Sequence, residues 1–257
     1  FKVPYVLHPH SGGIGTNDRG ERFSKRLQKG VESLFSGAAK VLLLSESLRA
    51  GYADVLPSTM PTAVVGNGVL ETAAPKPKPA APLRLGFMGN LINYKGFHHA
   101  LDVLAQLPDA TLDVVGDFVS KDYRAQIRSQ IDELDLQTRV RFHGAQPPED
   151  AWRYLEDCHV FLFTSDWREG LPLVWLEAMM RGLPVASFRI GAWDLLEAVD
   201  ARLLAEIGDS KALASQIREV TQDTHELGAL CERVRSYALQ ELTASAWVGR
   251  IHKALEL

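Results

Sequence analysis

The sequence predicts an α/β fold of parallel, doubly wound sheets that helices cover on both faces. Short apolar runs rich in β-branched residues alternate with amphipathic stretches of helical period, which is the pattern of successive β-α-β units. The composition, with 46% hydrophobic and 23% charged residues, is that of a globular protein. A Pro-rich spacer, PKPKPAAP at 75–82, divides the chain into two unequal parts.

The expected strands follow one another along the chain with room for helices between most of them. They are VPYVL (3–7), KVLLLS (40–45), TAVVG (62–66), LRLGFMG (83–89), TLDVVG (111–116), RVRFHG (139–144), HVFLFTS (159–165), PVASF (184–188) and RLLAEI (202–207). Residues 83–240 hold enough strands for a complete doubly wound domain, whereas residues 1–74 hold only the last part of one. The tail from Ser210 is expected to be helical, and its end, 241–257, to form a helix that can pack back on the first part.

Charge and cysteine content exclude several classes of protein. The formal net charge of -4 and a pI near 6.1 give no overall basic field, so nucleic-acid binding is not expected. The two cysteines, Cys158 and Cys231, form no metal-ligand spacing, which fits a reducing cytoplasm. No apolar run of about 18 residues and no leader pattern occur, and a chain that starts at Phe1 is expected to be a fragment.

The segment REGLPLVWLEAMMRGLPV (168–185) is predicted to form a loop and a helix after a buried strand. Pro172 suits the first helical position, and Gly182 followed by Pro184 ends the helix before the next strand. Ligands of parallel sheets bind at the carboxyl ends of the strands, and the first backbone N–H groups of a helix attract an anion there. The segment therefore indicates a site for a phosphate.

Two glutamates, Glu169 and Glu177, bracket this apolar segment. Beside a phosphate they are favourable only if they accept hydrogen bonds from neutral hydroxyls on either side of the anion. A ligand with a central diphosphate and a polyol at each end is a nucleotide sugar. The alternative is that Glu169 only favours the amino end of the helix and that Glu177 points to solvent.

The ordered series of motifs resembles the retaining family-4 glycosyltransferases, the glycosyl transferases group 1, which have two Rossmann-like domains in the GT-B fold. EGLPLVWLEAMMRGLPV resembles their Glu, seven residues, Glu segment; VPYVLHPHSG, KVLLLSES, VVGNGV and GNLINYKG resemble other elements of both domains. The resemblance implies catalytic roles for His10, Lys95 and Glu169. It implies donor-binding roles for Asn67, Gly89, Asn90, Gly144, Gly170, Leu171, Pro172, Leu173 and Glu177, and no metal ligands.

Within this resemblance, Glu169 would contact the donor sugar, Glu177 the ribose hydroxyls, and Lys95 the diphosphate. Asn90 stands where the family commonly has arginine, which removes one cation; Lys95 with the helix dipole, or Arg168 or Arg189, could compensate, or the site is weakened. GAWDLLE (191–197) also departs from the Gly-Gly pair that is common in the family.

The resemblance implies transfer of a sugar, with retained anomeric configuration, from a nucleotide-diphosphate sugar to a carbohydrate or lipid-linked acceptor in polysaccharide, lipopolysaccharide or glycolipid assembly. No Asp-x-Asp motif occurs, so no metal cofactor is expected. Three alternatives remain open: a catalytically silent nucleotide-sugar binding module, a nucleotide-sugar epimerase of related fold, and a structural interaction domain.

A basic amphipathic helix is expected in NDRGERFSKRLQKGVESLF (17–35). Arg22, Lys25, Arg26 and Lys29 fall on one face, and Phe23, Leu27, Val31 and Leu34 line another. Such a helix can lie on an anionic membrane, which would add contact with the inner face of the membrane to a cytoplasmic location. The alternative is the solvated face of a helix that packs on the core.

Overall fold

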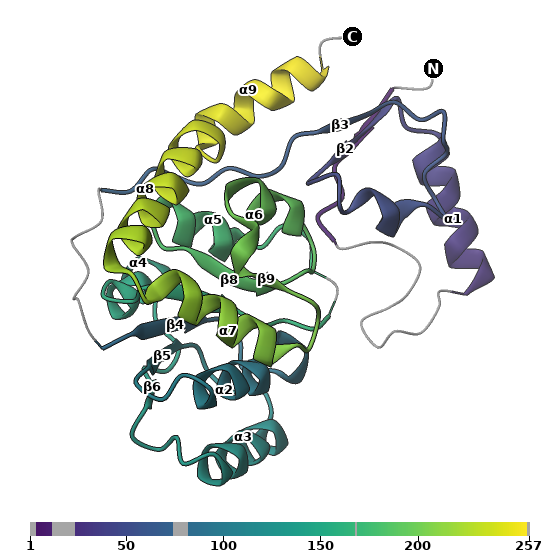
Figure 1. Ribbon diagram of the computed structural model, residues 1–257. Helices are drawn as coiled ribbons and strands as arrows, with labels where there is room; N and C mark the ends of the chain where they lie inside the picture. Colours follow the sequence, from purple (N-terminus) through teal and green to yellow (C-terminus); the bar gives the residue numbers. More distant parts are fainter. Residues whose placement is uncertain (1–3, 12–23, 74–81, 168, 256–257) are drawn as a thin grey trace.

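The computed structural model describes residues 4–11, 24–73, 82–167 and 169–255, which form two parallel β-sheets (Figure 1). The first sheet has three strands in the order β1-β2-β3, and the second has six in the order β6-β5-β4-β7-β8-β9. Every strand pair in both sheets is parallel. The α/β fold class that the sequence predicts is therefore confirmed.

The first sheet is small, and its strands lie side by side in the order in which they follow along the chain. It comprises β1 (Val6–Leu7), β2 (Lys40–Leu43) and β3 (Thr62–Val64), with helix α1 (Lys25–Ser36) and the 3-10 turn η1 (Arg49–Tyr52) between them. Phe35 of α1 stacks on Tyr52 with a ring-centroid distance of 6.0 Å, and both side chains are buried. This contact attaches the end of α1 to the η1 turn that follows β2.

The second sheet is doubly wound. Its strands are β4 (Arg84–Met88), β5 (Thr111–Val115), β6 (Val140–Phe142), β7 (Val160–Phe163), β8 (Val185–Phe188) and β9 (Leu204–Ala205). The helices of this part of the chain are α2 (Phe97–Ala105), α3 (Lys121–Glu133), α4 (Pro148–Ala151), α5 (Leu173–Met180), α6 (Trp193–Val199), α7 (Ser210–Thr221) and α8 (Thr224–Glu241), followed by α9 (Ala244–Leu255). Three 3-10 turns also occur: η2 (Asn93–Lys95), η3 (Trp152–Leu155) and η4 (Ala201–Leu203). The strand order reverses between β4 and β7, and such a point is where open α/β sheets bind ligands.

The expected strands are all present, but the first and the last are much shorter than the sequence suggests: among the described residues, VPYVL (3–7) pairs only over Val6–Leu7. In RLLAEI only Leu204–Ala205 pairs with β8, because Ala201–Leu203 forms a 3-10 turn that the Asp200 side chain caps. A second correction concerns α5, which begins at Leu173 with Pro172 as the residue before its first turn. The Pro-rich segment 75–82 lies outside the described residues except for Pro82.

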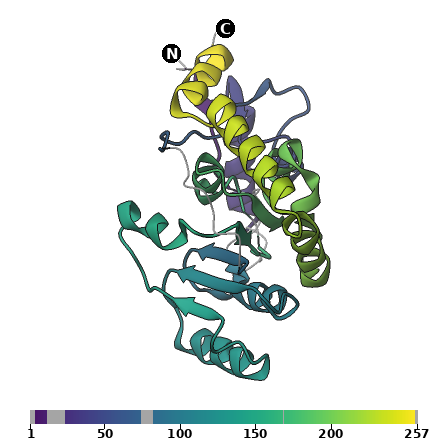
Figure 2. The same ribbon diagram turned by 60° about the vertical axis from the view of Figure 1, so that its left-hand side comes forward.

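Helix α9 leaves the six-stranded unit and packs on the three-stranded one (Figures 1 and 2). Arg250 Nε donates a hydrogen bond of 2.8 Å to Val65 O, and Trp247 Nε1 donates one of 3.1 Å to Gly66 O. Gly68 is tight against this helix, since a Cβ atom there would lie 2.7 Å from Trp247 Cβ. Ala254 of α9 forms a small, separate apolar cluster with Leu42 and Val65 of the first unit.

Within the described residues, no helix is long and apolar enough to span a membrane. Apart from that small cluster, most buried apolar side chains of the two units form one contiguous cluster, in which Leu44 of the first unit and Leu171 of the second both take part. The two units therefore share a packed junction.

Candidate functional site

A cavity of about 650 Å³ opens at the carboxyl ends of β4 and β5, beside the point where the strand order reverses. Its wall is formed by the loops after β4, β5 and β6, by the segment 68–72 that follows β3, by the α4-η3 segment, and by α5 with Arg181 at its end. Its lining includes Gly68, Thr72, Met88, Gly89, Asn90, Gly116, Asp117, Gln146, Trp152, Leu173, Glu177 and Arg181. The wall thus contains backbone-rich turns, polar side chains and the amino end of a helix.

Glu177 is fixed in this wall by its neighbours. Trp152 Nε1 donates a hydrogen bond of 2.9 Å to Glu177 Oε2. The guanidinium group of Arg181, one helical turn after Glu177, lies 4.6 Å from the centroid of the Trp152 ring and donates to Glu177 O at 2.9 Å. Burial lowers the pKa of Arg181, although Glu177 opposes that shift. The result is a carboxylate and a partly desolvated cation side by side in one wall.

A second pair of charges joins the loops after β4 and β7. Lys95 Nζ lies 2.6 Å from Glu169 Oε1, with side-chain exposures of 28% and 13%. Ser165 Oγ is within hydrogen-bond distance of both Glu169 Oε1, at 2.7 Å, and Tyr94 O, at 2.8 Å. Strands β4 and β7 are neighbours, so the pairing follows from the sheet order. Neither Lys95 nor Glu169 lines the large cavity.

Gly170 lies where the two units meet. A Cβ atom on Gly170 would be 2.7 Å from His10 O, and one on Gly191 would be 2.4 Å from Gly170 O. Ala192 N donates a hydrogen bond of 3.0 Å to the same Gly170 O. The loop that carries Glu169 is therefore held between the segment after β1 and the segment before α6, at a distance that only glycine allows.

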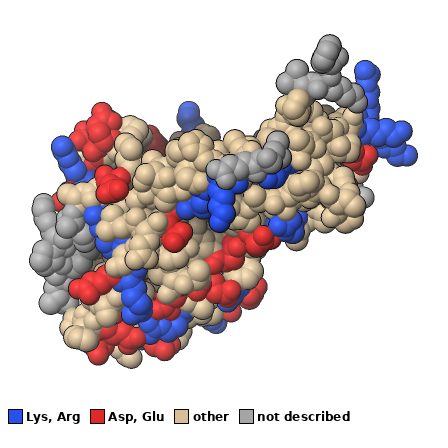
Figure 3. Space-filling model, turned by 90° about the horizontal axis from the view of Figure 1, so that it is seen from above, with Lys and Arg blue, Asp and Glu red and all other residues tan. Residues whose placement is uncertain are grey.

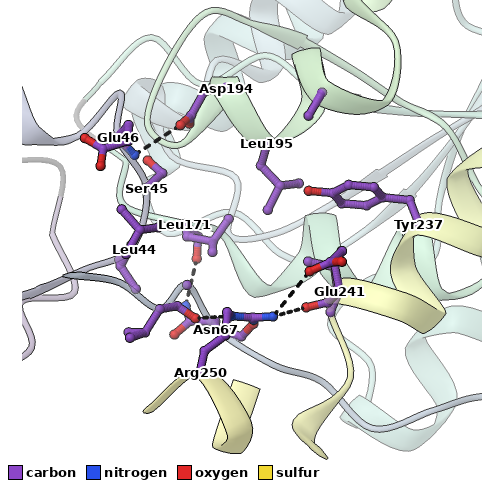
Figure 4. Close-up of a pocket in the computed structure, with 15 residues that line it drawn as sticks. Leu44, Ser45, Glu46, Asn67, Leu171, Asp194, Leu195, Tyr237, Glu241 and Arg250 are labelled. Carbon is purple, nitrogen blue, oxygen red and sulfur yellow. Dashed lines mark hydrogen bonds and ion pairs between the residues drawn. The ribbon is translucent and has the colours of Figure 1, made fainter. Parts of the chain in front are cut away.

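Asn67 and Leu171, both expected to bind the donor, line a different cavity. This one has a volume of about 290 Å³ and lies between the first sheet, α6, α8 and α9 (Figure 4). Asn67 Nδ2 is 3.4 Å from Leu171 O across it, and the Asn67 side chain is buried. In the structure these two residues therefore connect the units and lie outside the wall of the large cavity.

Asp194 of α6 forms hydrogen bonds across the junction between the two units (Figure 4). Its Oδ2 accepts hydrogen bonds from Glu46 N at 3.1 Å and Ser47 N at 3.2 Å, and Ser47 Oγ donates to Asp194 Oδ1 at 2.6 Å. Ser47 Oγ also lies 2.9 Å from Gly191 O. The GAWDLLE segment, which departs from the family pattern, thus supplies a contact with the loop after β2.

The family model of glycosyl transferases group 1 matches residues 71–241, about two thirds of the chain. The chain belongs to this family. It is 29% identical over 213 residues to 2-deoxystreptamine glucosyltransferase of Streptomyces kanamyceticus, a match that covers 79% of this chain and 54% of the relative. It is 31% identical over 148 residues to the lipopolysaccharide core biosynthesis glycosyltransferase LpsE of Rhizobium meliloti (strain 1021), which covers 57% of this chain and 42% of the relative. The chain thus spans about half the length of these curated relatives.

Solved glycosyltransferase structures share the GT-B fold with this chain. Anabaena Alr3699/HepE, solved in complex with UDP, superimposes with a TM-score of 0.82 and 25% identity; the match covers 98% of this chain and 72% of HepE. Sucrose-phosphate synthase from Thermosynechococcus elongatus also gives a TM-score of 0.82, at 21% identity, with coverage of 99% and 68%. The second likeness concerns the fold alone.

The residues that the group 1 resemblance implies fall into three places. Gly89, Asn90, Leu173 and Glu177 line the large cavity; Lys95, Glu169, Gly170 and His10 lie at the meeting of the β4 and β7 loops with the segment after β1; Asn67 and Leu171 line the junction cavity. Pro172 precedes α5, and Gly144, at φ +71°, accepts a hydrogen bond from Gly116 N. Of the proposed substitute cations, Arg189 is paired with Glu197 at 2.8 Å, and Arg168 lies outside the described residues.

Sequence reasoning missed Trp152 and Arg181. Arg181 follows Glu177 by four residues in the predicted helix, so both side chains are expected on the same helix face. This spacing could have indicated that Arg181 belongs to the site. Nothing in the sequence indicated Trp152, because its approach to Glu177 depends on how the α4-η3 segment folds back over the sheet.

Proposed function

We propose that this chain is the donor-binding part of a retaining glycosyltransferase that transfers a sugar from a nucleoside-diphosphate sugar to a hydroxyl of a carbohydrate or lipid-linked acceptor. The observation that carries the proposal is the cavity of about 650 Å³ at the carboxyl ends of β4 and β5, with Glu177 and the amino end of α5 in its wall. The UDP complex of HepE and the role in lipopolysaccharide core biosynthesis that the name of LpsE states support it.

Glu177 is proposed to hold the ribose of the nucleotide. Its carboxylate is an acceptor, and Trp152 Nε1 orients it through Oε2. The diphosphate would then lie near the first backbone N–H groups of α5, those of Leu173 and Val174, where the helix dipole favours an anion. Lys95 would share its ammonium group between Glu169 and the diphosphate.

For the transfer itself we propose retention without a metal. The bond between the anomeric carbon and the diphosphate oxygen breaks, and the acceptor oxygen bonds to that carbon from the same face. The proton of the acceptor hydroxyl passes to the departing diphosphate. Lys95 and the α5 dipole would stabilise the charge on the leaving group, which is the role that fixed electrostatic donors have in such reactions.

A binding experiment tests the donor site directly. UDP, GDP, ADP and their sugar conjugates would be tested for their effect on thermal unfolding in the presence of EDTA. A ligand at about 100 times its dissociation constant adds roughly 2.7 kcal/mol to the stability of the folded state. We expect one nucleotide series to raise the unfolding temperature, the effect to be lost in Glu177→Ala, and the exposed control Glu232→Ala to retain it. A protein that no nucleotide stabilises contradicts the proposal.

Turnover and stereochemistry need a second measurement. With the stabilising donor and a panel of glycan and lipid-linked acceptors, NMR of the product should show the same anomeric configuration as the donor, with rates unchanged by EDTA. Donor binding without transfer to any acceptor would indicate a nucleotide-sugar binding module. Conversion of the donor sugar in the absence of an acceptor would indicate an epimerase.

Helix α1 supports a further part of the proposal, contact with an anionic lipid surface. Lys25, Arg26 and Lys29 are exposed, and so are Leu27, at 50%, and Leu34, at 49%; Arg22 lies outside the described residues. Figure 3 shows basic side chains projecting from the right-hand end of the molecule, where Figure 1 places α1. Flotation with anionic liposomes should fall on charge reversal at the three basic positions and not on reversal of Lys121, Arg128 and Arg141. Equal flotation of both variants would contradict this contact.

A further inference from the structure

A second cluster of polar side chains lies beside the Lys95–Glu169 pair and outside the linings of both cavities. His98 and His99 stand in the first turn of α2, which follows the β4 loop, and Asp166 stands in the loop after β7. Because β4 and β7 are hydrogen-bonded neighbours, their carboxyl ends bring these residues together. Two imidazoles and one carboxylate form the set of ligands that proteins use for zinc and related metals.

The three side chains are too far apart for direct hydrogen bonds, but their spacing leaves room for an atom between them. Asp166 Oδ2 lies 3.6 Å from His99 Nε2 and 3.9 Å from His98 Nε2, both longer than a hydrogen bond. One ligand atom from each residue can be chosen so that all three lie within 4.8 Å of one another. Metal bonds of about 2.0 to 2.1 Å would place ligand atoms about 3.0 to 3.4 Å apart, so side-chain adjustments alone can close the site.

Neighbouring groups orient both imidazoles. His98 Nδ1 is 3.1 Å from Tyr123 OH, which also accepts a hydrogen bond from His98 N at 3.2 Å. The His99 ring packs edge-on against Phe188, with centroids 5.4 Å apart, and its Nδ1 faces Asp102 at 3.9 Å. Partners on the second ring nitrogen fix the orientation of metal-binding histidines. Exposures of 19% for each histidine and 31% for Asp166 leave the cluster open to solvent ions.

We propose that His98, His99 and Asp166 form a binding site for a divalent transition metal of the Zn²⁺ class. Imidazole nitrogens favour Zn²⁺, Co²⁺ and Ni²⁺ over Mg²⁺ and Ca²⁺, which prefer oxygen ligands. Three protein ligands leave at least one position for water or for an oxygen of a bound ligand. This metal would not hold the donor diphosphate, which is proposed to lie at the amino end of α5. Neither Glu177 nor that end of α5 belongs to the metal site.

The site would connect the two loops that carry the Lys95–Glu169 pair. Lys95 precedes His98 by three residues, and Glu169 follows Asp166 by three. Asp166 N already donates a hydrogen bond of 3.2 Å to Tyr94 O. A bound metal would add a coordination link between the same segments, so it acts as a positioning element for the pair and takes no part in the transfer.

Isothermal titration of the full chain with ZnCl₂ tests the proposal. The wild type is expected to bind one equivalent with a dissociation constant no weaker than about 10 µM. Asp166→Asn and His99→Ala should each weaken binding by at least about tenfold. His8→Asn is the matched control. The ring centroids of His8 and His10 are also only 4.3 Å apart, but this histidine pair is not part of the candidate metal cluster. MgCl₂ should give no binding at this site.

Two further measurements make the result decisive. Zn²⁺ should raise the unfolding temperature of the wild type and of His8→Asn, and should not raise that of Asp166→Asn; circular dichroism checks that each variant is folded. Co²⁺ should give visible absorption bands that His99→Ala lacks. The proposal is overturned if the wild type takes up no Zn²⁺, which would indicate a water-bridged cluster. It is also overturned if folded Asp166→Asn binds as tightly as the wild type.

Discussion

Lys95 Nζ lies 2.6 Å from Glu169 Oε1, although 74 residues separate them in the sequence. The contact joins the loops after two adjacent strands, at the point where the order of the second sheet reverses. In the proposed reaction this pair would neutralise part of the charge of the diphosphate and set the position of the Glu169 carboxylate before a donor binds. Its two partners are expected to behave as one unit in mutational experiments.

Replacing Lys95 by Met should weaken donor binding by about 10- to 100-fold, because a charge-assisted hydrogen bond is worth roughly 1.5 to 3 kcal/mol. The variant also leaves Glu169 without its cation, beside the expected diphosphate. Glu169→Gln in the same chain should therefore recover part of the loss, which titration calorimetry with the donor nucleotide can measure. Lys211→Met, at an exposed position on α7, is the control. Additive losses in the double variant would show that the two residues act independently.

Gly170→Ala should lower stability by about 1 to 3 kcal/mol, the usual cost of forcing extra atoms into a packed region. The new methyl group would lie 2.7 Å from His10 O and 3.2 Å from Leu44 Cδ1, both in the first unit. The junction between the units must therefore open, and donor binding should weaken with it. Urea denaturation measures the loss. Gly228→Ala on α8 is the matched control, since nothing lies within 4 Å of its new methyl group, and it should be neutral or slightly stabilising.

The sequence predicts the sheets well because strand and helix periods, and glycine or proline at their ends, are local signals. The group 1 resemblance implies donor-binding roles for Gly89, Asn90 and Glu177, and the structure brings them into one wall because strand ends and helix starts meet at one edge of a parallel sheet. The strand order itself depends on long-range packing. For that reason the sequence did not indicate that Trp152 reaches Glu177, or that Asn67 would face the junction cavity.

Helix α1 shows a second limit of local signals. The apolar spacing of Leu27, Val31 and Leu34 identifies one face of a helix but not what covers it. In the structure Phe35 is the buried contact, whereas Leu27 and Leu34 are half exposed. The period of apolar residues cannot distinguish a helix face that packs within the chain from one that is exposed and free to bind a partner.

Trp247→Ala should destabilise the protein by about 3 kcal/mol, the lower end of the range for truncating a packed tryptophan. The change removes the hydrogen bond that the Trp247 indole donates to Gly66 O, whereas the Cβ atom that faces Gly68 remains. We expect α9 to detach from the first sheet and to become sensitive to limited proteolysis. Val248→Ala, one residue away and 43% exposed, is the control and should leave the cleavage pattern unchanged. Protection of α9 in the Trp247 variant would mean that Arg250 and Lys40 suffice to hold it.

His8 should make stability depend on pH between about 6.5 and 4. Burial, and then the neighbouring His10, lower the pKa of His8 from 6.5 to about 4. Among the described residues, its buried Nε2 has no hydrogen-bond partner, while its Nδ1 lies 3.3 Å from His10 Nε2. A proton on the folded protein would therefore have no acceptor at Nε2 and would face a second imidazole.

The sign of this dependence follows from which state binds the proton. Between pH 6.5 and pH 4 the unfolded chain carries a proton on His8 and the folded protein does not, so stability falls as the pH is lowered through this window. Below pH 4 both states are protonated and His8 adds no further change. Unfolding temperatures at pH 7 and pH 5 should therefore differ less in His8→Asn than in the wild type. His252→Gln, exposed on α9, should keep the full difference. An equal pH response in His8→Asn and the wild type would show that His8 takes up its proton as readily in the folded protein as in the unfolded chain.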